Sequence, residues 1–132
     1  MNPPGSISDH DLIRNTIARN NQYLDDRRYE DCARTFAEDG SIAGHQGRTA
    51  ILEFMHSQGL GANPQLQRRH VVTNIAIEVA GNVAHVDSDL LVYDKLGSEP
   101  WKLAAVGRYA DQLTRQSDGN WLFAKRQLTF IE

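Results

Sequence analysis

Apolar side chains recur at helical spacing in the first third of the chain and alternate with polar ones afterwards. The first helix is predicted from four apolar residues close to a 3.6-residue period: Leu12, Ile13, Ile17 and Leu24. Ser8 or Asp9 can cap its N-terminus, because both side chains can accept a hydrogen bond from a free backbone N–H. Residues 1–7 are expected to form a flexible leader, which leaves 8–132 as a single domain.

Three shorter elements are predicted to follow a break at Asp25-Asp26. The inward side of a second helix would carry Tyr29, Cys32, Ala33 and Phe36. Gly40 is expected to end that helix, and residues 41–43 and 45–46 to form two short strands around Gly44. A third helix would begin at Thr49 and stop at Gly59 and Gly61.

The second half of the chain has the composition of strands. Four runs rich in Val, Ile, Leu, Thr and aromatic residues are separated by turn residues, and they span 67–79, 83–94, 101–116 and 120–131. We predict a four-stranded antiparallel meander, and therefore an α+β fold with helices first and strands last. Strands this long must twist and coil, so the helices can close over the concave side and leave a cavity.

The bulk properties narrow the functional class. The chain has 132 residues, of which 40% are hydrophobic and 23% charged, and its formal net charge is −3. This mild acidity argues against a nucleic-acid or anionic-membrane partner. No run approaches the roughly 20 apolar residues that span a bilayer, and no secretory signal is present, so a cytoplasmic location is expected. Cys32, the sole cysteine, is predicted to be a buried structural thiol.

Two residues far apart in the chain suggest acid–base chemistry, namely Asp25 and His70. Histidine is the side chain best suited to move protons near neutral pH, and a carboxylate can fix its tautomer and stabilise its charged form. A carboxylate at a helix C-terminus is unfavourable by about 0.3–1 kcal/mol. Asp25 could therefore be retained for function while Asp26 serves as the cap, although Asp25 could also be a simple cap.

The strict alternation of strand residues does not decide whether His70 faces solvent or a pocket. It places His70, Val72 and Asn74 on one face and the more apolar set Val71, Thr73, Ile75, Ile77 and Val79 on the other. A plain two-sided sheet would pack the second face on the helices and leave His70 in solvent. A coiled sheet in an oligomer would bury both faces, and the mixed face with His70 would then suit a pocket wall.

Further polar residues are candidates for the pocket wall. Arg126 stands in an apolar row, where it would bind an anionic group or form a structural ion pair. Tyr23, Asn74 and Arg108 could supply hydrogen bonds to a ligand. The five histidines lack metal-ligand spacing and no glycine-rich phosphate loop is present, so a site without metal or cofactor is expected.

Several local strings together resemble the SnoaL-like branch of the nuclear transport factor 2 superfamily. They are Tyr23-Leu24-Asp25, Phe36-Ala37-Glu38-Asp39-Gly40, Gly47-Arg48-Thr49-Ala50-Ile51, His70-Val71-Val72-Thr73-Asn74, Gly107-Arg108-Tyr109 and Asp118-Gly119-Asn120-Trp121 with Arg126. The resemblance implies a cone-shaped fold in which three N-terminal helices pack on a strongly curved, mostly antiparallel sheet. That scaffold hosts many reactions, so the fold alone does not fix the function.

Within that superfamily the chain is similar to scytalone dehydratase and hexachlorocyclohexane dehydrochlorinase, which use a His–Asp dyad. The His-x-x-Thr-Asn string at His70 to Asn74 and the position of Asp25 carry this similarity. The chain departs from other members, because 101–116 holds no second pocket histidine and Gly44 stands where ketosteroid isomerase has its base. The Asp–Arg–Asp arrangement of the epoxide hydrolases has no clear match either.

These observations predict a cofactor-independent lyase, of the dehydratase or dehydrohalogenase type, that acts on a small, cyclic, largely apolar substrate. Asp25 would orient His70, and His70 would take a proton from carbon. The alternatives are an isomerase or polyketide cyclase using the same pocket, or a non-catalytic protein that binds a small ligand. The apolar second face of the long strands predicts a homo-oligomer, either a dimer or a trimer.

Overall fold

The computed structural model describes residues 7–57 and 63–132. The predicted leader, apart from Ile7, and the predicted helix stops Gly59 and Gly61 lie outside the described residues. The elements are α1 (Asp9–Asp25), α2 (Tyr29–Ala33), β1 (Phe36–Ile42), β2 (His45–Gln46), α3 (Arg48–Ser57), β3 (Leu66–Ala80), β4 (Val83–Leu96), β5 (Lys102–Arg115) and β6 (Trp121–Phe130). The four long strands lie within two residues of their predicted bounds.

Helix α1 begins and ends where capping chemistry places its ends. The Ser8 side chain accepts a hydrogen bond from the backbone N–H of Asp11, 3.2 Å away, and so satisfies one free donor of the first turn. Asp26 is the C-cap residue, which leaves the Asp25 side chain free for another partner. The buried side of the helix carries Ile13 and Ile17 and, nearer its C-terminus, two asparagines.

The prediction that the second helix extends to Gly40 is wrong. Helix α2 ends at Ala33, and Phe36 begins strand β1, which pairs in parallel with β6. Gly40 is a strand residue at a close approach of two backbones. A Cβ atom at this position would lie 2.7 Å from the Phe123 carbonyl oxygen. The glycine that resembled a helix stop therefore allows the β1–β6 contact.

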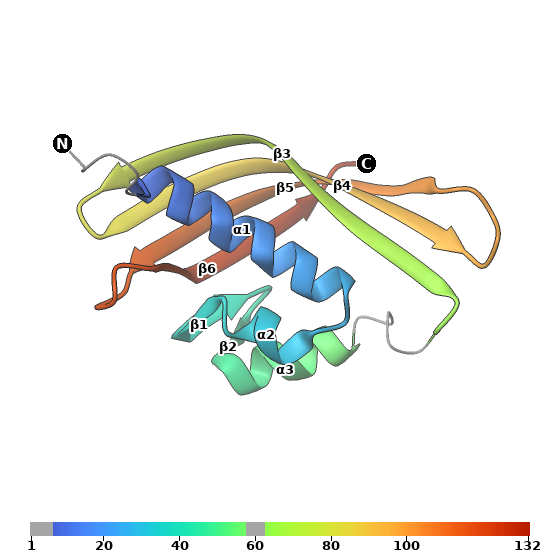
Figure 1. Ribbon diagram of the computed structural model, residues 1–132, viewed down its shortest axis with the longest axis horizontal. Coiled ribbons are helices and arrows are strands. Elements are labelled where there is room, and N and C mark those ends of the chain that lie inside the picture. Colours follow the sequence, from blue (N-terminus) through green and yellow to red (C-terminus); the bar gives the residue numbers. More distant parts are fainter. Residues whose placement is uncertain (1–6, 58–62) are drawn as a thin grey trace.

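The six strands of the described residues form one open, curved sheet in the order β2-β1-β6-β5-β4-β3. The neighbours β3–β4, β4–β5 and β5–β6 are antiparallel, as predicted, and β1–β6 is the parallel exception. The long helix α1 crosses the concave face, while α2 and α3 lie below it beside β1 (Figure 1). This is the predicted α+β arrangement of three helices on a strongly curved, mostly antiparallel sheet.

β-bulges interrupt the alternation of the long strands. The β3–β4 register shifts between Thr73 and Ala76, and the bulged residue Asn74 has a positive φ of 51°. The β5–β6 register shifts in the same way between Phe123 and Lys125. Because an extra residue reverses the side-chain order beyond it, the apolar residues after Asn74 return to the face that carries His70.

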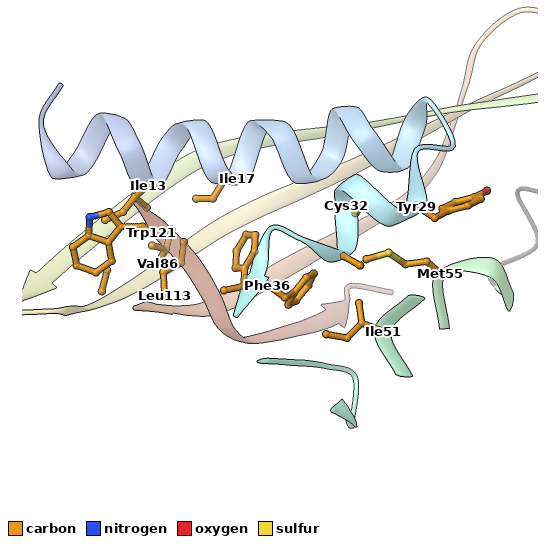
Figure 2. Close-up of a cluster of buried hydrophobic side chains, with 13 residues drawn as sticks. Ile13, Ile17, Tyr29, Cys32, Phe36, Ile51, Met55, Val86, Leu113 and Trp121 are labelled. Carbon is orange, nitrogen blue, oxygen red and sulfur yellow. The ribbon is translucent and has the colours of Figure 1, made fainter. Parts of the chain in front are cut away.

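The main core lies between the helices and the sheet. Ile13 and Ile17 of α1 point toward Val86, Leu113 and Trp121 of the sheet (Figure 2). The other side of the cluster is formed by Phe36 with Cys32 and with Ile51 and Met55 of α3. In residues 7–57 and 63–132, no helix has the length and apolar character needed to cross a membrane.

Candidate functional site

The structure brings Asp25 and His70 together at the seam between α1 and β3. Asp25 Oδ1 lies 2.6 Å from His70 Nδ1, and Asp25 Oδ2 accepts a hydrogen bond of 3.0 Å from the His70 backbone N–H. One carboxylate therefore holds both the ring and the main chain of the histidine. The side chains of Asp25 and His70 are only 6% and 11% exposed, so little water competes for this contact.

His70 also lines a partly open cavity of about 290 Å³ between the helices and the sheet. The other lining residues are mostly apolar: Leu24, Ile42, Phe54, Met55, Leu90, Val92, Ala104, Ala105, Leu128 and Phe130, with Asn20, Arg68 and Tyr109 as the polar members. Since Nδ1 is held by Asp25, Nε2 is the nitrogen available for other chemistry. Within the described part of the chain, no group hydrogen-bonds Nε2.

A smaller cavity of about 200 Å³ lies on the α1–β3 side of the same pair. Val72, a predicted binding residue, lines this cavity together with Asp25 and His70. Val72 also packs against the buried cluster of Leu90, Val92 and Tyr109. Val72 therefore lines the smaller cavity beside Asp25 and His70, and it is not among the residues that line the larger cavity.

Arg68 stands on the wall of the larger cavity, two residues before His70. Its Nε and Nη2 atoms donate to the two oxygens of Asp94 at 2.7 and 2.8 Å, a bidentate pair across β3 and β4. These hydrogen bonds hold the pKa of the Asp94 carboxyl below its usual range, although burial opposes the shift. The positive charge of Arg68 is thus already matched.

Arg126 lies beneath the cavity and is completely buried. Its Nε donates to Asp111 Oδ1 at 3.0 Å and its Nη1 to Asn20 Oδ1 at 2.8 Å. The guanidinium lies 3.5 Å from the centroid of the Tyr109 ring. Burial raises the pKa of the Asp111 carboxyl to about 6, although Arg126 acts in the opposite direction. The structure therefore places Arg126 in a buried ion pair under the cavity.

Cys32 is buried beside this network. Its thiol donates to the Asn20 carbonyl oxygen at 3.3 Å, and burial raises its pKa to about 12. Such a thiol carries almost no thiolate near neutral pH, as a structural cysteine should.

Three predicted wall residues lie away from the larger cavity. Asn74, at the bulge, donates to Asp89 at 2.8 Å on the exposed face of the sheet, where Arg108 donates to the same carboxylate at 2.6 Å. Tyr23 packs under the guanidinium of Arg28, 4.7 Å from ring centroid to Cζ, outside the site. The bulge explains the position of Asn74, because the extra residue turns its side chain away from the cavity.

Sequence reasoning missed Arg68, Tyr109 and Asn20 as residues of the cavity wall. Arg68 shares the strand face of His70, so alternation could have found it. Tyr109 and Asn20 gave no comparable signal, because their positions depend on which strand and helix face each other. In 7–57 and 63–132, no three His, Cys, Asp or Glu side chains come together as metal ligands would.

The profile of the SnoaL-like domain matches residues 5–127. No curated protein matches the sequence. Solved structures with similar folds include a putative scytalone dehydratase from Novosphingobium aromaticivorans, with 26% sequence identity and a TM-score of 0.77, covering 92% of this chain and 83% of that one.

Two further solved structures resemble the chain in fold. ActVI-ORFA from Streptomyces coelicolor has 22% identity and a TM-score of 0.83, covering 92% of this chain and 93% of its own. An NTF2-like protein with a cystatin-like fold, also from N. aromaticivorans, has 23% identity and a TM-score of 0.80, covering 94% and 82%. At these identities the likeness concerns the fold alone.

Proposed function

Because this chain belongs to the SnoaL-like domain family, whose profile spans nearly all of it, we propose that it is a cofactor-independent lyase. The reaction would be the dehydration of a small cyclic substrate, with Asp25 and His70 as the acid–base pair. The observation that carries the proposal is the 2.6 Å contact between Asp25 Oδ1 and His70 Nδ1 beside a largely apolar cavity. The 26% identity to a putative scytalone dehydratase supports dehydration over dehydrohalogenation.

The geometry divides the work between the two residues. Asp25 accepts a hydrogen bond from Nδ1–H, so Nε2 carries the lone pair that acts as base. As His70 gains a proton, the adjacent carboxylate stabilises the imidazolium. The backbone N–H of His70 fixes the second carboxylate oxygen, so the pair needs little reorganisation during the reaction.

An isomerase or polyketide cyclase is the second candidate, because the same base and cavity can make an enolate without expelling a leaving group. A protein that only binds a ligand is the third. Mass spectrometry separates the first two, since dehydration removes one water from the substrate and isomerisation conserves its mass.

The test begins with a panel of cyclic β-hydroxy ketones screened for loss of water by the wild-type protein. We expect His70→Ala to lower turnover by about 10²- to 10⁴-fold, the usual value of general-base catalysis. Asp25→Asn should lower turnover as well, because the amide cannot stabilise the imidazolium. His85→Ala is the matched control, because His85 is an exposed histidine on β4 outside this cavity.

The folded state of each variant is checked by circular dichroism and thermal melting. Full turnover in both His70→Ala and Asp25→Asn on a confirmed substrate would contradict the dyad. If the wild type shows no measurable turnover and the two variants only lose affinity for a ligand, the ligand-binding alternative is favoured.

A further inference from the structure

The smaller cavity at the α1–β3 seam has no role in the proposed reaction. It has a volume of about 200 Å³ and lies between one face of α1 and the edge strand β3. Its lining residues follow helical spacing on α1 and flank the bulge on β3: Arg14, Ile17, Ala18, Asn21, Gln22 and Asp25, with His70, Val72 and Ile75. Because β3 is the outermost strand, this seam lies at the side of the sheet, where solvent is close.

The two cavities border the Asp25–His70 pair differently. Among the described residues, His70 alone lines both cavities, whereas Asp25 lines only the smaller one. The histidine therefore lies between two spaces, and the carboxylate that holds its Nδ1 borders the smaller space. A ligand in the larger cavity would cover His70 from that side and leave the approach past Asp25 open.

The wall of the smaller cavity suits water. Five of its nine lining residues are polar or charged, whereas the larger cavity is mostly apolar. Asn21 is only 4% exposed, and its Nδ2 donates to the Ile17 carbonyl oxygen at 3.1 Å. Its Oδ1 is buried and has no hydrogen-bond partner in residues 7–57 and 63–132. Buried polar atoms are nearly always paired, and ordered water is the usual partner where the protein supplies none.

The rim of the smaller cavity opens to solvent and carries no competing acid. Arg14, Ala18 and Gln22 are exposed on α1. In the described part of the chain, the other charged side chain that lines either cavity is Arg68, which is paired with Asp94. Asp25 and His70 are therefore the two groups of this wall that can exchange a proton with water near neutral pH.

We propose that the smaller cavity is a water entrance through which the Asp25–His70 pair exchanges protons with solvent, even when a ligand fills the larger cavity. Two observations carry the proposal: Asp25 borders only this cavity, and the buried acceptor Asn21 Oδ1 stands in its wall without a partner. The value of the entrance for catalysis rests on the proposed function, because a working base needs its protonation state restored.

The exchange balances with water alone. When the ring of His70 is doubly protonated, a water beside Asp25 accepts the Nδ1 proton. The N–H bond breaks, its electron pair stays on nitrogen, and a new O–H bond forms on the water. The excess proton passes along hydrogen-bonded waters to solvent, and the ring is left neutral. The reverse transfer charges the ring again.

Nuclear magnetic resonance of protein labelled with ¹⁵N-histidine measures this exchange without a substrate. The Nδ1–H signal of His70 is assigned by its absence in His70→Ala, and its exchange rate is measured by magnetisation transfer from water. Ala18→Leu fills the smaller cavity from the exposed side of α1. Ala104→Leu is the matched control, because it places the same side chain at an exposed position of the larger cavity. Asn21→Leu is a second test variant, which removes the unpartnered acceptor.

Excluding water adds a barrier of at least one hydrogen bond, so exchange should slow by about tenfold or more in Ala18→Leu and Asn21→Leu. Ala104→Leu should exchange like wild type. A signal too broad to detect in wild type and Ala104→Leu, but visible in Ala18→Leu, reports the same slowing. The proposal is overturned if Ala18→Leu, folded as judged by thermal melting, exchanges like wild type, or if Ala104→Leu slows the exchange as much.

The entrance and the lyase fail separately. If Ala18→Leu alone slows the exchange but wild type dehydrates no substrate, the entrance stands and the lyase falls. If His70→Ala abolishes dehydration while Ala18→Leu exchanges like wild type, the lyase stands and the entrance falls.

Discussion

At the scale of single residues, Arg126 and Asp111 form an ion pair that is fully buried in the fold. Both side chains are completely buried, and the guanidinium donates a further hydrogen bond to Asn20 Oδ1. A buried pair of this kind adds little net stability, but removing one partner leaves an unmatched charge in the core. The Arg126 guanidinium of this pair also packs against the ring of Tyr109, 3.5 Å from its centroid.

We therefore predict that Arg126→Met and Asp111→Asn each lower the free energy of unfolding by about 3–5 kcal/mol at pH 7. The double variant Arg126→Met/Asp111→Leu should cost less than either single change, since it buries no charge. Urea denaturation measures all three. Equal and additive losses would show that the two charges are not coupled.

The two single variants should respond differently to pH. Burial raises the pKa of Asp111 in the folded protein to about 6, above its usual value in an unfolded chain of about 3.9. Without Arg126 that pKa rises further, so folded Arg126→Met takes up a proton as the pH falls and the unpaired charge disappears. Its loss of stability should thus be smaller at about pH 5 than at pH 7, while Asp111→Asn, which keeps the arginine charged, shows no such relief.

At the scale of elements, the β3 bulge decides which residues face the cavity. Asn74 sits at φ 51°, a region that β-branched residues rarely adopt. Before it, Arg68, His70 and Val72 face inward, and beyond it Ile75 does so as well. The bulge therefore lets one strand contribute polar residues to the site and apolar residues to the core on the same face.

We predict that Asn74→Val lowers the free energy of unfolding by about 1–3 kcal/mol, because valine is strained at positive φ. Asn74→Gly should cost less, because glycine adopts this conformation freely and only the exposed contact with Asp89 is lost. Thr73→Val is the matched control at the neighbouring exposed position, where a change within about 0.5 kcal/mol is expected. If Asn74→Val and Thr73→Val unfold at the same urea concentration, the positive φ is not required for the fold.

The same bulge marks the limit of prediction from sequence. Turn residues and apolar runs were enough to locate the four long strands and their antiparallel order. Strict alternation placed Ile75, Ile77 and Val79 opposite His70, because a single inserted residue leaves no signal in the pattern. The strand from Phe36 was predicted as helix for a related reason, since its partner β6 lies some 85 residues further along the chain (Phe36↔Phe123).

At the scale of the whole molecule, the sheet is longer than the helical layer that covers it. The β4–β5 hairpin extends past the helices (Figure 1). Large apolar side chains are exposed in this hairpin and at the C-terminal end of β6. They are Leu96, Trp101 and Leu103 of the hairpin, and Phe130 and Ile131 at the end of β6, which we together call the distal apolar end. Phe130 also lines the cavity, so the end of the sheet continues into the site.

We expect this distal apolar end to pack against a second copy of the chain, because a patch of this kind is uncommon on a monomer. The charge-introducing variant Leu103→Glu should then shift the protein from oligomer to monomer in sedimentation velocity measurements. Leu103 is 54% exposed and does not line the cavity, so the substitution should leave the fold and the His70–Asp25 contact intact. Gln127→Glu is the control, because it adds the same charge at an exposed position of β6 without removing apolar surface. A wild-type protein that sediments as a monomer at every concentration, or a Leu103→Glu variant that stays assembled, would contradict the expectation.

In an oligomer that uses the distal apolar end, Phe130 would also be covered at the mouth of the cavity. Dissociation by Leu103→Glu should then weaken the binding of apolar ring compounds such as nitrobenzene, whereas Gln127→Glu should not.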